Sequence, residues 1–478
     1  MTFNSITFLV FFIVTSIFIL ITNIDFKTKK DRKIHLRHII LLLASYVFYG
    51  WWNWKCAFLM LALTYIAYWS AAKADKTNNK IYLCIGIVFP LVILGIFKYF
   101  NFFVDSFSYV FGITKTRSLN IILPVGISFY TFQSMSYTID VYRKQVRCEK
   151  NFIKLALYIA FFPQLVAGPI VKSKEFIHQL YEDRNISWSN LKTGIQIFVF
   201  GLFKKIVIAD NISVCVDAVF NSPQNFHALS IIMAVIGYSI QIYCDFSGYS
   251  DMAIGSAKIL GYDLMCNFNM PYVAKNISAF WKRWHISLST WLQEYLYISL
   301  GGNRKGEVRT YINLFLTMLI GGLWHGASWT FVLWGALHGV ALCIHKIWMK
   351  LTRHDKNYKG TIVGNICSIA VTYLFVSFCW IFFRAENFEI AKNIISGIVK
   401  WQNGIVYISS WTILGIICVV VSTLFAYIRS LLKKTEIQGF YPTVNLESVY
   451  GMVILFVAIG VCLMLAYTGS SPFIYFQF

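Results

Sequence analysis

Residues 311–349 read YINLFLTMLIGGLWHGASWTFVLWGALHGVALCIHKIWM, a long apolar stretch that is interrupted at its centre by glycines, tryptophans and a histidine. Basic residues cluster at both of its ends: Arg304, Lys305, Arg309, Lys346, Lys350 and Arg353. The positive-inside rule places such basic ends in the cytoplasm. The stretch is therefore predicted to be a hairpin that enters the membrane and returns to the same side.

His325 lies at the break of this hairpin. The first arm, from Tyr311 to Trp324, would reach about 21 Å at 1.5 Å per residue, which is less than a full crossing. The break is therefore expected at membrane depth, where irregular backbone persists only if it is buried in protein or lines a watery cavity. An ionisable side chain is costly there, so His325 is the first candidate for a functional residue.

The rest of the chain has the same character. Of its 478 residues, 58% are hydrophobic and only 13% are charged, which is typical of a polytopic membrane protein. Apolar stretches recur near residues 5–22, 38–52, 56–72, 81–100, 121–142, 152–168, 191–211, 229–247, 311–349, 362–383, 408–430 and 449–467. Several are short or interrupted, so we expect an all-α integral membrane protein with about eleven transmembrane helices, plus re-entrant or interfacial helices, around a central funnel.

The net charge of +21 is explained by membrane topology, because the basic residues fall in short loops between the apolar stretches. No nucleic-acid partner is predicted. The 11 cysteines are scattered without a close pair, so neither a zinc site nor a redox dithiol is expected, and no metal is predicted.

The basic loops also predict the orientation of the chain. The stretch near 5–22 lacks a basic region before it and is followed by a basic loop at 27–37, so we expect a retained anchor with the N-terminus outside. The last apolar stretch leads outward again, which places the tail 468–478 at the outer face. Without an internal repeat or a linker, residues 1–478 are predicted to form a single polytopic domain.

The segment 263–309 does not read as a span. Its residues 280–292, FWKRWHISLSTWL, mix tryptophans and cations at helical spacing, which predicts helices lying in the cytoplasmic interface. The run GGNRKG at 301–306 lacks the spacing of a Walker loop, so it indicates phosphate binding only weakly.

Several motifs occur together in one order along the chain. They are FWKRWHISLSTWL at 280–292, YLYISLGGNR at 295–304, LWHGA at 323–327, WGALHG at 334–339, QIYCDFSGYSD at 241–251, LPVGISFY at 123–130 and FFRA at 382–385. From about residue 40 onward the chain resembles the membrane-bound O-acyltransferases, and it is most similar to the branch of bacterial alginate and peptidoglycan O-acetyltransferase membrane components.

The resemblance implies that His325 is the essential histidine and that His285 is a second, less strictly required one. It implies acetyl-CoA as a cytoplasmic donor substrate without a bound cofactor, and a chain that lies in the bacterial inner membrane; the basic loops place both of its termini outside. The acyl group would leave on the outer face, where an acetyltransferase-like or esterase-like partner passes it to a polysaccharide.

The tail matches a pattern of the same family, Phe-x-Tyr-x-x-Phe, as Phe473, Tyr475 and Phe478. In the teichoic-acid D-alanylation branch a separate small protein carries this pattern, so its presence here argues against that branch. We expect Tyr475 to act in the transfer, with Phe473 and Phe478 as anchors; an anchoring role for all three aromatics is the simpler alternative.

The chemistry can also be argued from the residues. Acyl transfer from a thioester to a hydroxyl needs a base, and a histidine with a pKa near 6.5 suits this task. No Gly-x-Ser-x-Gly elbow is present, which favours direct transfer or relay through a tyrosine over a serine acyl-enzyme. Further expected roles are cavity walls at Trp324 and Trp329, cavity lining or helix capping at Asp245 and Asp251, and donor binding by Lys282, Arg283, Arg304 and Lys305.

Other interpretations stay open at this point. His285 could be structural, and His338 and His345, without a companion carboxylate, are expected to pack in the core rather than bind metal. A proton-coupled transporter or flippase would also use intramembrane histidines and aspartates. Within the enzyme class, the acceptor could be alginate or another exopolysaccharide, peptidoglycan or teichoic acid, while membrane lipids surround the chain in every case.

Overall fold

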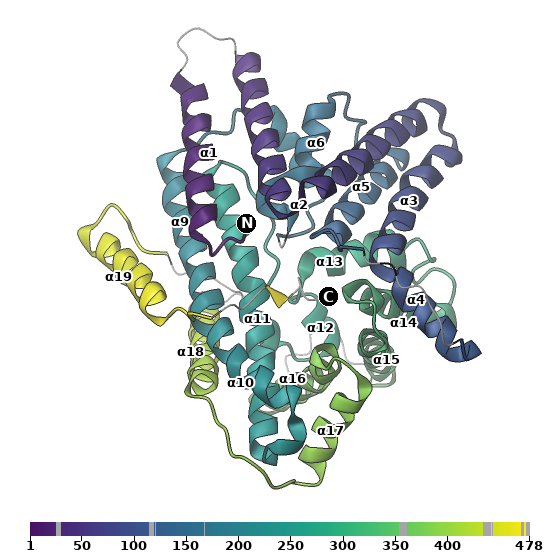
Figure 1. Ribbon diagram of the computed structural model, residues 1–478, viewed down its shortest axis with the longest axis vertical. Helices are drawn as coiled ribbons and strands as arrows, with labels where there is room; N and C mark the ends of the chain where they lie inside the picture. Colours follow the sequence, from purple (N-terminus) through teal and green to yellow (C-terminus); the bar gives the residue numbers. More distant parts are fainter. Residues whose placement is uncertain are drawn as a thin grey trace. The chain divides into compact units, whose positions relative to one another are not determined.

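The computed structural model describes residues 1–24, 30–113, 119, 121–166, 168–352, 361–433, 441, 443–469 and 473–474. These residues form helices and connecting loops without a β-strand, apart from one isolated bridge between Phe226 and Ile405 (Figure 1). The prediction of an all-α fold is confirmed. Among the described residues, six helices are long and apolar enough to cross a membrane: Ile34–Thr77, Lys80–Phe111, Ala228–Ile259, Trp329–Leu351, Ile362–Arg384 and Ser410–Ser430.

The predicted number of about eleven spans is not confirmed, and the short helices explain the difference. The apolar stretch 152–168 forms a helix of only 9 residues, Phe152–Ala160, which would extend about 14 Å at 1.5 Å per residue. The helix Ile127–Tyr142 is buried along almost its whole length, so its apolar side chains face protein. A buried helix and a lipid-facing helix can have the same composition, so these two stretches are not established as spans.

The chain folds as two compact units. The first comprises Met1–Val199 and Tyr249–Met265, and the second comprises Phe200–Gly248 and Cys266–Phe478. Two helices, α9 (Trp188–Leu202) and α11 (Ala228–Ile259), contribute residues to both units. That the whole chain acts as a single domain stays a prediction.

The first unit is built largely from long antiparallel helices and a buried loop region. Its other elements are α1 (Ile6–Ile24), α2 (Lys30–Thr77), α3 (Lys80–Leu94), η1 (Gly95–Tyr99), α4 (Phe100–Phe111), α5 (Ile127–Tyr142), α6 (Phe152–Ala160), α7 (Phe162–Leu165), α8 (Ser173–Phe176) and η2 (Ile177–Tyr181). The α2 helix is kinked at Asn53, where the backbone is extended with φ of −158°. The buried guanidinium of Arg37 donates to the Asn185 side chain at 2.6 Å and thereby ties α2 to the loop after η2.

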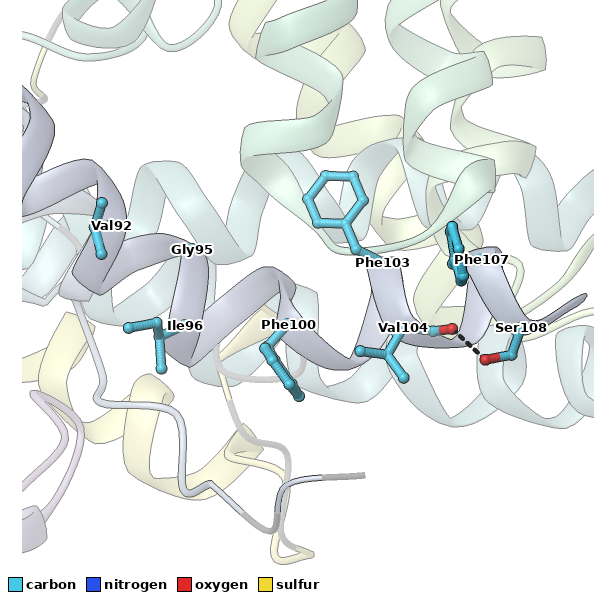
Figure 2. Close-up of a pocket in the computed structure, with 8 residues that line it drawn as sticks. All are labelled: Val92, Gly95, Ile96, Phe100, Phe103, Val104, Phe107 and Ser108. Atoms are coloured by element: carbon cyan, nitrogen blue, oxygen red, sulfur yellow. Dashed lines mark hydrogen bonds between the residues drawn. The ribbon is translucent and has the colours of Figure 1, made fainter. Parts of the chain in front are cut away.

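An apolar groove of about 500 Å³ runs along α3, η1 and α4 in this unit (Figure 2). Its lining is almost entirely aliphatic and aromatic: Val92, Gly95, Ile96, Phe100, Phe103, Val104, Phe107 and Ser108. The hydroxyl of Ser108 donates to the Val104 carbonyl oxygen at 2.7 Å, so the groove's one side-chain hydroxyl is satisfied within the helix. Such a surface suits contact with lipid chains.

The second unit holds the motifs that the sequence singles out. Its other elements are η3 (Phe203–Ala209), α10 (Asp210–Asn221), η4 (Pro223–Asn225), η5 (Pro271–Val273), α12 (Ile277–Trp281), α13 (Ile286–Trp291), η6 (Leu292–Tyr297), α14 (Glu307–His325), α15 (Trp329–Leu351), α16 (Ile362–Arg384), α17 (Phe388–Val399), α18 (Ser410–Lys433) and α19 (Val449–Leu465). In the segment 263–309 the tryptophans Trp281, Trp284 and Trp291 are buried and pack into the protein. That this segment lies in the cytoplasmic interface stays a prediction.

The histidine hairpin consists of α14 and α15, which lie side by side (Figure 1). The α14 helix begins at Glu307, before the expected start at Tyr311, so its 19 residues reach about 28 Å at 1.5 Å per residue. It ends at His325, and the hydroxyl of Ser328 caps α15 by accepting a hydrogen bond from the backbone N–H of Thr330.

Glycines allow the backbones of these two helices to touch. A Cβ atom at Gly335 would collide with the Met318 carbonyl oxygen and would lie 3.0 Å from the Cα of Gly322. Small residues at such crossings permit the close packing that holds helices together in membranes. Because Gly322 is one turn before His325, this contact fixes the height and rotation of the histidine.

We expect Gly335→Ala to destabilise the second unit by about 1–3 kcal/mol, since the added methyl group has no room between the two backbones. Acyl transfer should fall in parallel as His325 moves. Thermal unfolding in detergent measures the stability. The matched control is Gly460→Ala, where an added Cβ meets no atom within 4 Å. Equal unfolding temperatures for the two variants would contradict the role given to this contact.

Candidate active site

Three aromatic rings surround His325, the buried last residue of α14. The ring centroids of Trp324, Trp334 and Phe383 lie 5.0, 5.0 and 5.3 Å from that of the imidazole, at interplanar angles of 78°, 86° and 69°. These edge-to-face contacts come from α14, α15 and α16. They hold the ring in one orientation and keep water from the faces that they cover.

His285 lies beside His325, with ring centroids 6.4 Å apart. It is completely buried and precedes α13 in the left-handed conformation, with φ of 43° and ψ of 55°. This conformation costs a non-glycine residue about 1–3 kcal/mol, so neighbouring contacts must maintain it. One of them is the hydrogen bond from the backbone N–H of Ile286 to the Asn267 carbonyl oxygen at 2.9 Å.

The side chain of Asn267 determines which nitrogen of His285 carries the proton. Its Oδ1 accepts hydrogen bonds from the Ser287 backbone N–H at 3.2 Å and from the Ser287 hydroxyl at 2.9 Å, which fixes this atom as the oxygen of the amide. Nδ1 of His285 lies 3.2 Å from the same oxygen and must therefore donate to it. The neutral imidazole then has its proton on Nδ1, and Nε2 keeps its lone pair.

Burial also keeps this imidazole neutral. Desolvation lowers the pKa of His285, which lies outside the candidate spans, from 6.5 to about 3. A neutral histidine with an unprotonated Nε2 accepts a hydrogen bond from a hydroxyl but holds a transferred proton poorly. His285 therefore suits the orientation of a hydroxyl.

Asp245 forms a hydrogen bond with the tail near His285 and His325. Its Oδ2 accepts a hydrogen bond from the backbone N–H of Ile474 at 2.8 Å. The neighbouring side chain along α11, Phe246, packs on both the tail and the site, because its ring centroid lies 5.9 Å from that of Phe473 and 4.6 Å from that of His285. The expected lining role of Asp245 therefore takes the form of a contact with the tail.

The structure tests the expected roles of the aspartates but not those of the last tail residues. Tyr475 and Phe478 lie outside the described residues. Asp245 and Asp251 both lie in the interior of α11, so neither caps a helix end, and the capping alternative is wrong. Asp251 is buried and belongs to the first unit.

The predicted donor-binding cations lie in two environments. Lys282, Arg304 and Lys305 are exposed, as a docking surface for phosphates requires. Arg283 is half-buried, and its Nη1 donates to the Asn269 carbonyl oxygen at 3.0 Å. Arg283 therefore also stabilises the loop that carries the active-site asparagine.

The tryptophans and the other histidines are placed as follows. Trp324 contacts His325, whereas Trp329 at the start of α15 is 55% exposed, and the second tryptophan against the imidazole is Trp334. His338 is buried one turn after Trp334 among aromatic rings, and His345 forms a hydrogen bond with Ser278 at 3.1 Å. In the part of the chain that the structure describes, no group of three or more His, Cys, Asp or Glu side chains could hold a metal ion.

The comparison with known proteins identifies the family. Residues 143–385, about half of the chain, match the membrane-bound O-acyltransferase family. The chain belongs to the membrane-bound O-acyltransferase family. It is therefore an acyltransferase and a multi-pass membrane protein.

Relatives within the membrane-bound O-acyltransferases cover most of the chain. A "Probable alginate O-acetylase" of Pseudomonas putida is 38% identical over 472 residues, 92% of this chain and 94% of the relative. A "Peptidoglycan O-acetyltransferase" of Helicobacter pylori is 39% identical over 389 residues, 75% of this chain and 73% of the relative. A "Teichoic acid D-alanyltransferase" of Bacillus subtilis is 28% identical over 285 residues, 56% of this chain and 71% of the relative.

Sequence reasoning on this acyltransferase missed Asn267 and gave no role to Trp334 or Phe383. The latter two stand in the motifs WGALHG and FFRA, so motif membership was a usable signal for them. Asn267 stands outside all of the motifs and 18 residues before His285. Only the folded loop reveals that it contacts the histidine.

We expect Asn267→Ala to lower the turnover of this acyltransferase about tenfold or more, because the Nδ1–H of His285 and the N–H of Ser287 lose a buried acceptor. Asn267→Asp keeps an acceptor oxygen and should retain more activity. Its negative charge favours the imidazolium, so it should raise the pH at which activity is lost on acidification. Steady-state rates between pH 4 and 8 measure both effects.

The matched control is Ser289→Ala, since this hydroxyl donates to the Trp284 carbonyl oxygen instead of contacting the amide. Wild-type turnover in Asn267→Ala would refute the positioning role of the asparagine.

Proposed function

We propose that this chain moves an acetyl group from cytoplasmic acetyl-CoA across the membrane for the O-acetylation of an extracytoplasmic polysaccharide. The observation that carries the proposal is the buried pair of His285 and His325 inside an aromatic cage. The relatives support a polysaccharide acceptor, because the alginate and peptidoglycan enzymes cover more of the chain, at higher identity, than the D-alanyltransferase does.

The two histidines divide the chemistry. A hydroxyl oxygen attacks the thioester carbonyl carbon, the carbon–sulfur bond breaks, and the hydroxyl proton passes to His325 and then to the CoA sulfur. Nε2 of His285 accepts a hydrogen bond from the attacking hydroxyl and aligns it. Aromatic side chains around the pair exclude water, which limits hydrolysis of the thioester.

The attacking hydroxyl is proposed to be the phenol of Tyr475. The tyrosine would leave the site as an acetyl ester and present the acetyl group to an extracytoplasmic partner protein, which transfers it to the polysaccharide. The burial of Phe473 and Ile474 beside Phe246 supports a tail that enters the site. This arrangement moves the acyl group across the bacterial inner membrane while the donor stays on the cytoplasmic side, with both termini outside.

We expect His325→Ala to abolish acetyl transfer while the protein still inserts into the membrane, because loss of a general base costs a factor of about 100 to 10,000. The assay uses purified enzyme in liposomes with acetyl-CoA, and thermal unfolding reports on folding. His178→Ala serves as control, since this imidazole is exposed and forms a hydrogen bond with the Lys174 carbonyl oxygen one turn before it. Acetyl transfer near the wild-type rate, or proton-coupled flux without acyl turnover, would refute the proposal.

The exposed cations are proposed to attract the phosphates of the donor. We expect the triple variant Lys282→Gln, Arg304→Gln, Lys305→Gln to raise the KM for acetyl-CoA at least about threefold, while kcat changes little, because exposed charge pairs each contribute about 0.2–1 kcal/mol. The salt dependence of KM should weaken as well. Arg283 is left in place because it supports the loop of Asn269.

A second triple variant controls for net charge: Lys73→Gln, Lys76→Gln, Lys80→Gln. These exposed lysines lie at the end of α2 and at the start of α3, around a turn that is predicted to face the same side. An equal effect of the two triple variants on KM would show that the three donor-side cations have no specific role.

A further inference from the structure

A buried ion cluster lies in the second unit at the junction of η3, α10 and α11. The side chain of Lys205 is 1% exposed, and its Nζ lies 2.6 Å from Oδ1 of Asp210 and 2.6 Å from Oδ1 of Asp245. Desolvating three charges is expensive, and hydrogen bonds to the remaining oxygens must offset part of the cost. Asp245 obtains such a bond from the tail, because its Oδ2 accepts the N–H of Ile474.

The helix that carries Lys205 has an unusual backbone. Residues Phe203–Ala209 form a π-helix, in which hydrogen bonds run to the fifth residue. Insertions of this kind are rare and occur frequently at functional sites. Here the Ile206 carbonyl oxygen accepts a hydrogen bond from the backbone N–H of Tyr467 at 3.3 Å, outside its own helix.

A second contact holds the chain just before the tail. Nδ2 of Asn211 donates to the Leu465 carbonyl oxygen, the last residue of α19, at 2.9 Å. Two hydrogen bonds to backbone atoms of Leu465 and Tyr467 thus fix the chain that leaves α19 to η3 and α10. These contacts recognise backbone atoms, so they set the position of the tail independently of its side chains.

The end of this path is buried. Phe473 is 0% exposed, and Ile474 is buried as well. The ring of Phe246 lies between Phe473 and His285, in contact with both. Two adjacent residues of α11 therefore contact the tail: Asp245 binds the backbone of Ile474, and Phe246 packs on the ring of Phe473. Phe246 also packs on His285.

We propose that Asp245 is a positioning residue that docks the tail through the backbone N–H of Ile474. Lys205 and Asp210 hold Asp245 in place. Docking sets the register in which the next residue meets the histidine pair. This inference rests on the proposed role of the tail tyrosine. A carboxylate suits this task, since hydrogen bonds to charged groups are about twice as strong as neutral ones.

The test compares variants on both sides of the contact. Asp245→Asn keeps the shape of the side chain, but its amide has only one acceptor oxygen, so it cannot accept hydrogen bonds from both Lys205 and Ile474. Ile474→Pro removes the backbone N–H that donates to Asp245. Each is expected to lower kcat for acceptor acetylation about tenfold to a hundredfold, without a change in the KM for acetyl-CoA. In the double variant the loss should not exceed that of the worse single variant, because both remove the same bond.

Thr468→Pro is the matched control, since it removes a backbone N–H from an exposed position of the same segment. Its activity is expected to stay within about twofold of the wild type. A direct readout of docking is digestion of the folded full-length protein by carboxypeptidase, followed by intact mass. Trimming should stop near Ile474 in the wild type and should proceed further in Asp245→Asn.

The outcomes separate docking from the proposed relay. Unchanged trimming in Asp245→Asn, together with equal activities of Ile474→Pro and Thr468→Pro, overturns the docking role even if Tyr475→Phe is inactive. Full activity of Tyr475→Phe overturns the tyrosine relay, while trimming that depends on Asp245 would still support docking. Additive losses in the double variant would mean that Asp245 acts by a route other than Ile474, which also overturns the proposal.

Discussion

The structure of the second unit depends on one constraint: two imidazoles, His285 and His325, are held next to each other, buried among aromatic side chains. A hydrogen-bond partner stabilises a histidine in such a place, since unsatisfied polar groups are costly in apolar surroundings. For His285 the partner is Asn267, whose oxygen is itself fixed by Ser287. The left-handed backbone at His285 is the local cost of bringing these groups together.

The same constraint explains the packing around the site. His325 is the last residue of α14. The chain leaves the helix at Gly326, whose backbone is extended. The contact of Gly322 with Gly335 brings α15 close enough for Trp334 to cover the imidazole. A larger residue at either glycine would separate the helices and open the site to water.

The sequence predicted the helical class and the membrane character, because apolar composition and basic loops reflect solvent preferences that act along the whole chain. It also singled out His325, since an ionisable residue in an apolar hairpin is conspicuous. It did not establish the number of spans, because α5 and α6 are buried in protein, which composition does not separate from contact with lipid. It missed Asn267 because the partners of this side chain are a backbone N–H and an imidazole 18 residues away, joined only by the fold of a loop.

Asp245 shows why a residue can be noticed correctly and interpreted incompletely. An aspartate in an apolar helix suggests either a cap or a cavity, and both readings treat it as an isolated group. In the folded chain it shares Lys205 with Asp210 through one oxygen and binds the tail backbone through the other. Because Phe246 follows it on α11 and contacts His285, a shift of the tail cannot leave the surroundings of the histidine unchanged. Docking of the tail and geometry of the active site are thus coupled through two consecutive residues of one helix.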